Sequence, residues 1–339
     1  FLAEVSNPIG AAILLAKESI HLKEGSRVLS GDIVVNDEGV TDLGLQLEAG
    51  VTTPIDFEVR ANRIKAKPGA QLLGTIYFNR LDDGGTITGR KFTPLDLPVF
   101  DLLPPFSSGF TGPDDIIVPK NKIQTLEPGY YRDLEVEKNG VVSFQGGIYN
   151  FRSVILKRLA HLEFQGPTEI RIEQTLQSAP GTYLGPSEDS LTRPSEIIFH
   201  IAGLDTGPVN LIEDGSSVRV NLYAPNGQFK FGKNSFLEGA FIAREITINS
   251  NCLLRLDSYF STLLPEENLP PLSTGDSAST LEDLSVGLDV LANDTDPDGD
   301  QLTLVGFTQP QAGVVSLVTQ NQLVYTPWDD FFGTDTFSY

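Results

Sequence analysis

Four aspartates at alternate positions form the residue pattern with the clearest chemical meaning in this chain. They lie within Leu288–Asp300, in the run Asn293-Asp294-Thr295-Asp296-Pro297-Asp298-Gly299-Asp300. Carboxylates this close together repel one another unless a cation neutralises them. The proline and the glycine favour a tight turn, and hard oxygen ligands on a turn suit Ca²⁺, which takes about six to eight oxygen atoms. The run therefore indicates a site for a divalent cation.

An EF-hand loop is the alternative calcium motif with a similar composition. If Asp294 is position one, Gly299 falls at position six, as that motif requires. Position twelve, however, is Val305, where the motif needs a bidentate glutamate. The sequence therefore does not fit an EF-hand. A solvated acidic turn without a metal stays open as the other interpretation.

The same region resembles a known family of modules. The likeness is carried by the run D-V-L-A-N-D-T-D-P-D-G-D-x-L-T, by Leu323–Pro327 and by Phe332–Tyr339. These motifs are similar to those of the cadherin-like, Ig-like sandwich modules strung along bacterial surface proteins, over roughly residues 269 to 339. The resemblance implies a spacer or adhesive stalk whose acidic turn binds calcium. It also implies four ligand candidates: Asp294, Asp296, Asp298 and Asp300.

The sequence departs from that family at its end. Modules of this type normally continue past the F-x-Y strand into a last strand, whereas this sequence stops at Tyr339. Two explanations stay open: the remainder was lost, or another chain supplies it. We expect an open edge on this module that can accept an extended arm such as Phe1–Asn7 from another copy.

An internal repeat points to the fold of the longer first part. Residues 129–146 and 147–166 align as G-[YI]-Y, V-x-[VL] and x-F-Q-G, with a period of about twenty residues. Apolar residues alternate over three to five positions, as in Leu134/Val136, and then break at Gly or Asn. Short strands separated by tight corners predict a parallel β-solenoid, in which each coil stacks on the last at ~4.8 Å. Right-handed winding is the default.

The expected fold class is therefore all-β: a right-handed parallel β-solenoid followed by an incomplete Ig-like β-sandwich. The first part also resembles, less specifically, the β-helical repeat regions of large exported bacterial proteins, through stretches such as Gly146–Phe151 and Gly239–Ala243. The expected domains are an N-terminal arm (1–16), the solenoid (17–261), a Pro-rich linker (262–272) and the module (273–339). A Pro- and Phe-rich stretch, residues 80–115, predicts an irregular excursion from the solenoid.

Charge and composition limit the function classes. The formal net charge is −21, and the sequence after Arg255 carries 14 acidic residues and no Lys or Arg. Nucleic acid and anionic membranes need a basic footprint, so we expect neither as a partner. No run of ~18 apolar residues predicts a membrane span. The sequence starts at Phe1 and has no methionine, which favours a processed product of an exported precursor and an extracellular, cell-surface location.

Catalytic motifs are absent from the sequence. The three histidines, His21, His161 and His200, lie in alternating stretches without a G-x-S-x-G or H-E-x-x-H motif. Cys252 is the single cysteine of the sequence, so no internal disulfide can form. Its strand-like context fits a small core residue. A polysaccharide lyase or hydrolase would need clustered Asp, Arg and Lys, but the candidate pairs Asp82/Asp83 and Asp114/Asp115 lack a nearby basic cluster in obvious register. We therefore expect a protein that is not an enzyme.

Taken together, the residues predict an extracellular structural protein of the bacterial surface. We expect it to assemble with itself into a filament, sheath or stalk, with Ca²⁺ making the Ig-like module rigid. A surface adhesin that binds a glycan or a protein is the first alternative. A polysaccharide lyase or hydrolase on a β-helix is the second.

Overall fold

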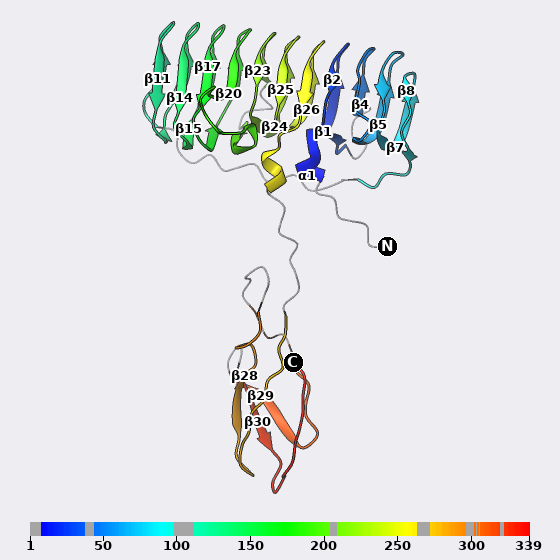
Figure 1. Cartoon of the computed structure of the whole chain (residues 1–339), viewed down its shortest axis with the longest axis vertical. Coiled ribbons are helices and arrows are strands. Elements are labelled where there is room, and N and C mark those ends of the chain that lie inside the picture. Colours follow the sequence, from blue (N-terminus) through cyan, green and yellow to red (C-terminus); the bar gives the residue numbers. More distant parts are fainter. Residues whose placement is uncertain are drawn as a thin grey trace. The chain divides into compact units, whose positions relative to one another are not determined.

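The computed structural model describes residues 8–37, 44–97, 112–203, 209–262, 272–295, 302, 304, 306–318 and 322–339. The chain divides into two compact units, Phe1–Leu264 and Pro265–Tyr339, and the division falls within the segment expected to be a linker. Strands dominate both units, and the described helices are short (Figure 1). They are α1 (Pro8–Ala11), η1 (Pro194–Glu196) and η2 (Tyr259–Thr262).

The first unit is a parallel β-solenoid with three rows of strands. The first row contains β12 (Gly129–Tyr130), β15 (Gly147–Phe151), β18 (Thr168–Ile172), β21 (Ile197–Ile201), β3 (Asp32–Val35) and β9 (Lys91–Phe92). The second row contains β10 (Ile116–Val118), β13 (Asp133–Val136), β16 (Ser153–Leu156), β19 (Leu176–Ser178), β22 (Val209–Ile212) and β4 (Gly44–Leu47).

Five longer strands pass from the first row into the second: β24 (Asn221–Phe231), β26 (Phe241–Ile248), β1 (Ala12–Leu22), β5 (Glu58–Ala66) and β7 (Thr75–Asp83). The third row contains β11 (Ile123–Leu126), β14 (Val141–Phe144), β17 (His161–Phe164), β20 (Tyr183–Pro186), β23 (Ser217–Val218), β25 (Phe236–Glu238), β27 (Leu253–Arg255), β2 (Arg27–Val28), β6 (Gln71–Leu72) and β8 (Thr86–Ile87). Short parallel strands in rows are what the twenty-residue repeat predicts. The right-handed winding stays a prediction.

The coils do not stack in chain order, which corrects the expectation that each coil lies on the last. Residues 116–255 form consecutive coils, and β26 and β27 then pair with β1 and β2 near the start of the chain. From there the coils continue to β7, β8 and β9 at the other end. Figure 1 shows this join, with yellow β26 next to blue β1 and β2. β1 therefore lies in the interior of the stack, and the two segments of coils lead to opposite ends.

The interior of the solenoid is a continuous apolar column. Inward side chains such as Leu134, Val154 and Ile246 are fully buried, because each is covered by its counterparts on the coils above and below. Phe144 stacks on Phe164 with ring centroids 4.9 Å apart and meets Tyr149 edge-on at 4.8 Å. The alternation of apolar and polar residues in the sequence thus becomes one core shared by all coils.

The corner between the second and third rows has a fixed backbone conformation. In successive coils it holds a residue with positive φ: Asn121, Asn139, Leu159, Gly181, Gly215, Asn234, Asn251, Gly25, Gly50 and Gly69. This left-handed region is accessible to glycine and tolerated by asparagine, which explains why the sequence pattern breaks at these two residue types. Two asparagine pairs extend the corner across coils, with Asn139 Nδ2 donating to Asn121 Oδ1 at 2.7 Å.

Two expected boundaries are corrected by the structure. The segment 1–16 was expected to be an arm, but β1 begins at Ala12 and pairs with β26 and β3. Ala12 and Leu15 of β1 point away from the solenoid interior and pack in a cluster with Phe260 of η2. Both faces of β1 are therefore apolar, so the sequence lacks the alternation that marks a strand. The excursion was expected from residue 80, but β7, β8 and β9 continue the coils to Phe92.

The second unit is a small antiparallel sheet in the order β28 (Val286–Asp289), β30 (Gln322–Pro327) and β29 (Gly313–Leu317). Its core contains the buried residues Val290, Val315 and Leu323, with Phe307, Tyr325 and Phe337 packed against them. Thr308 N donates to Ser338 O at 2.8 Å, so the closing segment of the chain lies beside the middle of the unit. A sheet of this size has a small core and depends on such polar contacts for stability.

Candidate functional site

The acidic turn of the second unit is only partly described. Of the four ligand candidates, Asp294 lies in the described part, whereas Asp296, Asp298 and Asp300 lie outside the described residues. Asp294 Oδ1 accepts a hydrogen bond from Thr274 N at 2.7 Å, so one carboxylate oxygen holds the backbone next to the turn. Within the described residues, no group of three or more His, Cys, Asp or Glu could hold a metal ion.

A tyrosine connects the closing segment to this region. Tyr339 Oη donates to Asp276 Oδ2 at 2.9 Å and also lies 3.5 Å from Asp294 Oδ1 and 3.2 Å from Thr274 O. Loss of solvent, followed by the hydrogen bond to the Asp276 carboxylate, raises the pKa of Tyr339 to about 12. The phenol therefore stays protonated at neutral pH and links residues 274–276, the base of the acidic turn and the closing segment.

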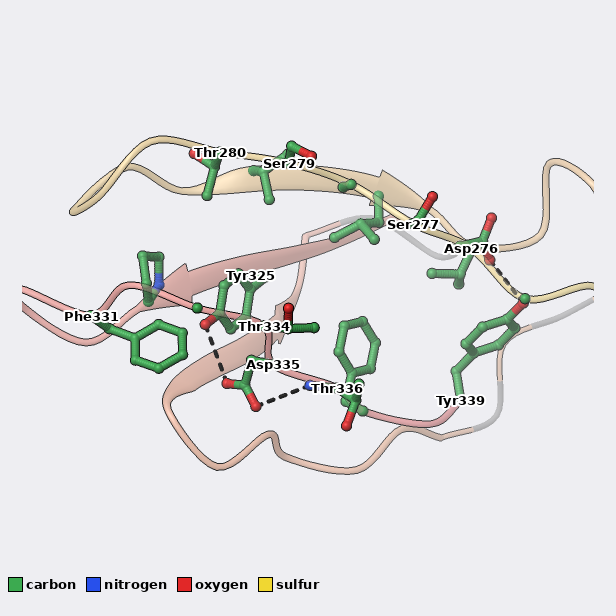
Figure 2. A pocket seen from close by; sticks show the side chains of 18 of the residues that line it. Asp276, Ser277, Ser279, Thr280, Tyr325, Phe331, Thr334, Asp335, Thr336 and Tyr339 are labelled. Carbon is green, nitrogen blue, oxygen red and sulfur yellow. Dashed lines mark hydrogen bonds between the residues drawn. The ribbon is translucent and has the colours of Figure 1, made fainter.

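A groove of about 790 Å³ runs along one side of the second unit (Figure 2). Its walls are residues 273–282 and 331–339, and its floor includes Val286, Leu288 and Val290. Residues 273–282 are exposed and form no strand. The groove therefore lies between two extended segments over an apolar floor. Strand acceptance at this edge stays a prediction, and the expected arm, Phe1–Asn7, lies outside the described residues.

Asp335 is the main polar anchor of this groove. Its carboxylate accepts hydrogen bonds from three backbone N–H groups, those of Ala312 at 2.8 Å, Thr336 at 3.0 Å and Gln311 at 3.1 Å. Tyr325 Oη donates to the same carboxylate at 3.2 Å. Desolvation pushes the pKa of Asp335 upward, but these donors outweigh it and hold the pKa below its usual value.

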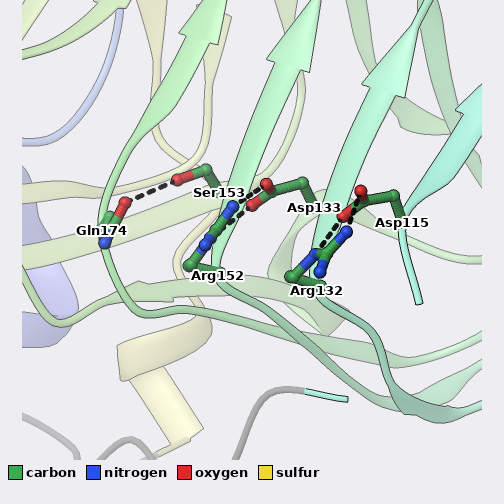
Figure 3. A network of polar contacts seen from close by, with 6 residues as sticks. All are labelled: Asp115, Arg132, Asp133, Arg152, Ser153 and Gln174. Carbon is green, nitrogen blue, oxygen red and sulfur yellow. Dashed lines mark hydrogen bonds and ion pairs between the residues drawn. The ribbon is translucent and has the colours of Figure 1, made fainter. Parts of the chain in front are cut away.

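Arginine–aspartate pairs connect successive coils of the solenoid (Figure 3). Arg132 binds the Asp115 carboxylate with two nitrogens, its Nε at 2.6 Å, and Arg152 binds Asp133 in the same way, its Nε at 2.9 Å. The row continues with Ser153 Oγ, which donates to Gln174 Oε1 at 3.2 Å. Each pair joins residues 17 or 19 positions apart in the sequence, about one coil.

The carboxylates considered for glycan cleavage do not form a common site. Asp82 and Asp83 lie on β7 at one end of the stack, and Asp115 precedes β10 at the other end. Basic partners do lie in register, contrary to expectation: Arg63 with Asp82 at 2.6 Å, Lys91 with Asp83 at 2.8 Å and Arg132 with Asp115. The guanidinium groups of Arg63 and Arg132 lower the pKa of Asp82 and Asp115, opposite to what a general acid needs.

One buried ion-pair cluster was not predicted from the sequence. The Glu238 side chain is only 6% exposed and lies between Arg219, whose Nε is 2.7 Å from Oε2, and Arg255. Two cations on neighbouring coils offset the cost of burying this carboxylate. The available signal was the spacing of 19 and 17 residues between the partners, which is close to one coil.

The three histidines and the cysteine lie in the solenoid and contact residues of the fold. His21 and His161 pair with Glu48 and Glu163 at 3.0 and 3.1 Å. Burial lowers the pKa of His200. Cys252 is fully buried, and its Sγ donates to Gly232 O at 3.1 Å, in agreement with a core residue.

Comparisons with known proteins give one family match and two similar structures. Residues 268–339 match the family model described as a bacterial Ig domain. A search of curated proteins finds no match. Two solved structures are similar in backbone: an ice binding protein from an Antarctic Biological Consortium, and an ice binding protein from an Antarctic bacterium, Flavobacteriaceae.

The first of these structures is 13% identical, with a TM-score of 0.39, over 74% of this chain and 89% of that one. The second is 12% identical, with a TM-score of 0.28, over 72% of this chain and 80% of that one. The strand pairing shows a parallel β-solenoid, and the family match shows a C-terminal bacterial Ig domain. No helix in the described part is long and apolar enough to cross a membrane.

Proposed function

We propose that this chain is an extracellular structural protein of the bacterial surface that assembles with itself into a filament, sheath or stalk. The observation that carries the proposal is the uninterrupted column of stacked coils, with its core and its polar pairs shared between neighbouring coils. Such a column resists bending because each coil is fixed by two others. The match of residues 268–339 to a bacterial Ig domain supports a surface location.

Calcium is the cofactor that we propose for the second unit. Carboxylate oxygens are the donors that Ca²⁺ prefers, and the chemistry of Asp294, Asp296, Asp298 and Asp300 fits that ion. Asp294 already holds Thr274 N through one oxygen, which leaves its other oxygen as the atom available for a cation. When bound, the ion would neutralise the repulsion between neighbouring carboxylates and fix the turn.

A non-catalytic role is part of the proposal. The candidate acids Asp82 and Asp115 are held by arginines and lie at opposite ends of the solenoid. Ice binding is not part of the proposed function. Contact with an ordered lattice requires outward side chains that repeat from coil to coil. The third row instead presents five different residues in successive coils: Val141, His161, Tyr183, Ser217 and Phe236. An assay of ice-growth inhibition by the full chain checks this point.

Antibody labelling and protease treatment of intact cells test the location, and electron microscopy of the purified full chain tests the structural role. We expect labelling of intact cells and regular assemblies in the microscope. Protein retained inside the cells would contradict the surface role. Dispersed particles that bind a glycan on an array would instead favour an adhesin.

A further inference from the structure

The chain enters and leaves the solenoid at the same place. The entering segment is α1, which leads directly into β1, and the leaving segment is η2, which follows β27. α1 contacts η2, and both lie beside the paired strands β1 and β26 in the interior of the stack. Figure 1 shows blue α1 and the yellow turn of η2 on one side of the coils. In a solenoid that starts at one end and stops at the other, these two points would be a whole stack apart.

The two segments share an apolar cluster that is distinct from the solenoid interior. Phe260 of η2 is fully buried, and its ring centroid lies 6.0 Å from that of Tyr223 and 5.7 Å from that of Tyr259. Ile9 of α1 packs against the same cluster. The other buried members come from the strands and turns beneath: Ala12, Leu15, Val34, Ile198, Ala240 and Ile242. We call α1, η2 and this cluster the clasp.

One asparagine adds polar contacts to the clasp. The Asn221 side chain is fully buried, and its Nδ2 donates to Pro194 O at 2.7 Å and to Ile197 O at 3.3 Å. Its Oδ1 accepts hydrogen bonds from Ala240 N at 2.9 Å and from Tyr259 N at 3.0 Å. Each polar atom of the buried amide is therefore satisfied, and the leaving segment is bonded to the coils on which it lies.

The strands beneath the clasp are held together along their length. β1 pairs with β26 from Leu14, opposite Phe241, to Leu22, opposite Ile248. Directly after β1, Lys23 Nζ donates to Asn249 Oδ1 at 2.6 Å. The first coil of the chain is thus fixed to its last coil through the first two rows of strands.

From this arrangement we infer that the clasp carries tension along the chain and shields the rest of the solenoid from it. The inference rests on the proposed function, since a structural protein of the cell surface is pulled along its chain. A force on the segments before Pro8 and after Thr262 acts on α1, η2, β1 and β26, which contact one another. The outer coils, residues 58–92 and 116–186, lie outside this path. In a solenoid loaded from end to end, every coil would transmit the force, because each coil contacts only its neighbours.

Single-molecule stretching of the full chain, with handles at its two ends, tests the inference. We expect the solenoid to stay folded until the clasp breaks and then to release residues 12–258, about 80–90 nm of extended chain. The second unit, residues 265–339, gives a separate release of about 25 nm. Phe260→Ala and Ile9→Ala should both lower the force at which the longer release begins, because each removes apolar contacts of the clasp.

Val154→Ala provides the matched control. It truncates a fully buried residue of the outer coils, so it should lower the melting temperature of the solenoid and leave the breaking force at the wild-type value. The inference is overturned if Phe260→Ala and Ile9→Ala, shown to be folded by circular dichroism, break at the wild-type force. It is equally overturned if Val154→Ala lowers the force as much as they do. The force is measured on single copies, so missing fibres contradict only the proposed self-assembly.

Discussion

At the scale of single residues, carboxylates in this protein stabilise the fold through the donors that surround them. Asp335 accepts hydrogen bonds from three backbone N–H groups and from one phenol. Asp115 and Asp133 each form an ion pair with an arginine of the next coil. The chain has one tryptophan, Trp328, next to β30. Its fluorescence therefore reports on the second unit alone.

Removing the Asp335 carboxylate should destabilise the second unit. Asp335→Ala leaves three backbone N–H groups without their partner, which costs roughly 1–2 kcal/mol. For a unit of this size the melting temperature, followed by Trp328 fluorescence, should fall by roughly 5–15 °C. Asp329→Ala, at an exposed position nearby, is the control and should melt like the wild type. An unchanged midpoint for Asp335→Ala would show that its hydrogen bonds contribute nothing.

Calcium removal should act on the same unit. A chelator should lower the Trp328 melting midpoint of the wild type, because the ion binds the folded state in preference to the unfolded one. Asp298→Asn should already melt at the lower temperature and respond little to the chelator. Asp335→Ala should keep its response, which separates ion binding from general instability. A wild type with the same midpoint in calcium and in chelator has no such site.

At the scale of elements, the solenoid repeats one corner conformation from coil to coil. The positive-φ position between the second and third rows is Gly or Asn in nine of the ten coils named above, and Leu159 (φ 60°) is the exception. A branched side chain in the left-handed region costs energy that glycine and asparagine largely avoid. This corner offers a direct test of the repeat.

Leu159→Asn should stabilise the solenoid by about 1 kcal/mol, since it relieves this backbone cost. The reciprocal change, Asn139→Leu, should destabilise it, because it introduces the cost and removes the 2.7 Å bond to Asn121. Denaturant unfolding followed by far-ultraviolet circular dichroism measures both. Equal and unchanged stabilities would contradict the corner assignment.

The elements also show what the sequence could and could not predict. Alternation in Leu134/Val136 and Val142/Phe144 predicts strands, and all four residues are buried. The coil order was not predictable, because every coil presents the same apolar interior and no local signal says that β26 pairs with β1. Arg132 and Arg152 were missed as partners of Asp115 and Asp133 for the same reason. Of the four candidate calcium ligands, the structure places only Asp294.

At the scale of the whole molecule, the ion pairs between coils make stability depend on pH. Arg63 and Arg132 hold the pKa of Asp82 and Asp115 below their values in the unfolded chain. The folded state therefore binds fewer protons, and this stabilisation is full above about pH 4 and is lost as the pH falls through the folded-state pKa.

Arg132→Gln should therefore melt below the wild type at pH 7 and converge with it on acidification, since Asp115 no longer has a lowered pKa. Arg158→Gln, which changes an exposed residue of a neighbouring coil, should follow the wild-type curve. Melting temperatures from pH 7 to pH 2 give the comparison. A constant gap between Arg132→Gln and the wild type at all pH values would mean that the pair does not cause the pH dependence.

Electron microscopy of the purified full chain in calcium tests the central claim most directly. The described residues form eleven coils, and at ~4.8 Å per coil they give a solenoid roughly 53 Å long. We expect regular fibres, which would support a surface rod that assembles with itself. Single dispersed particles at every concentration would contradict it.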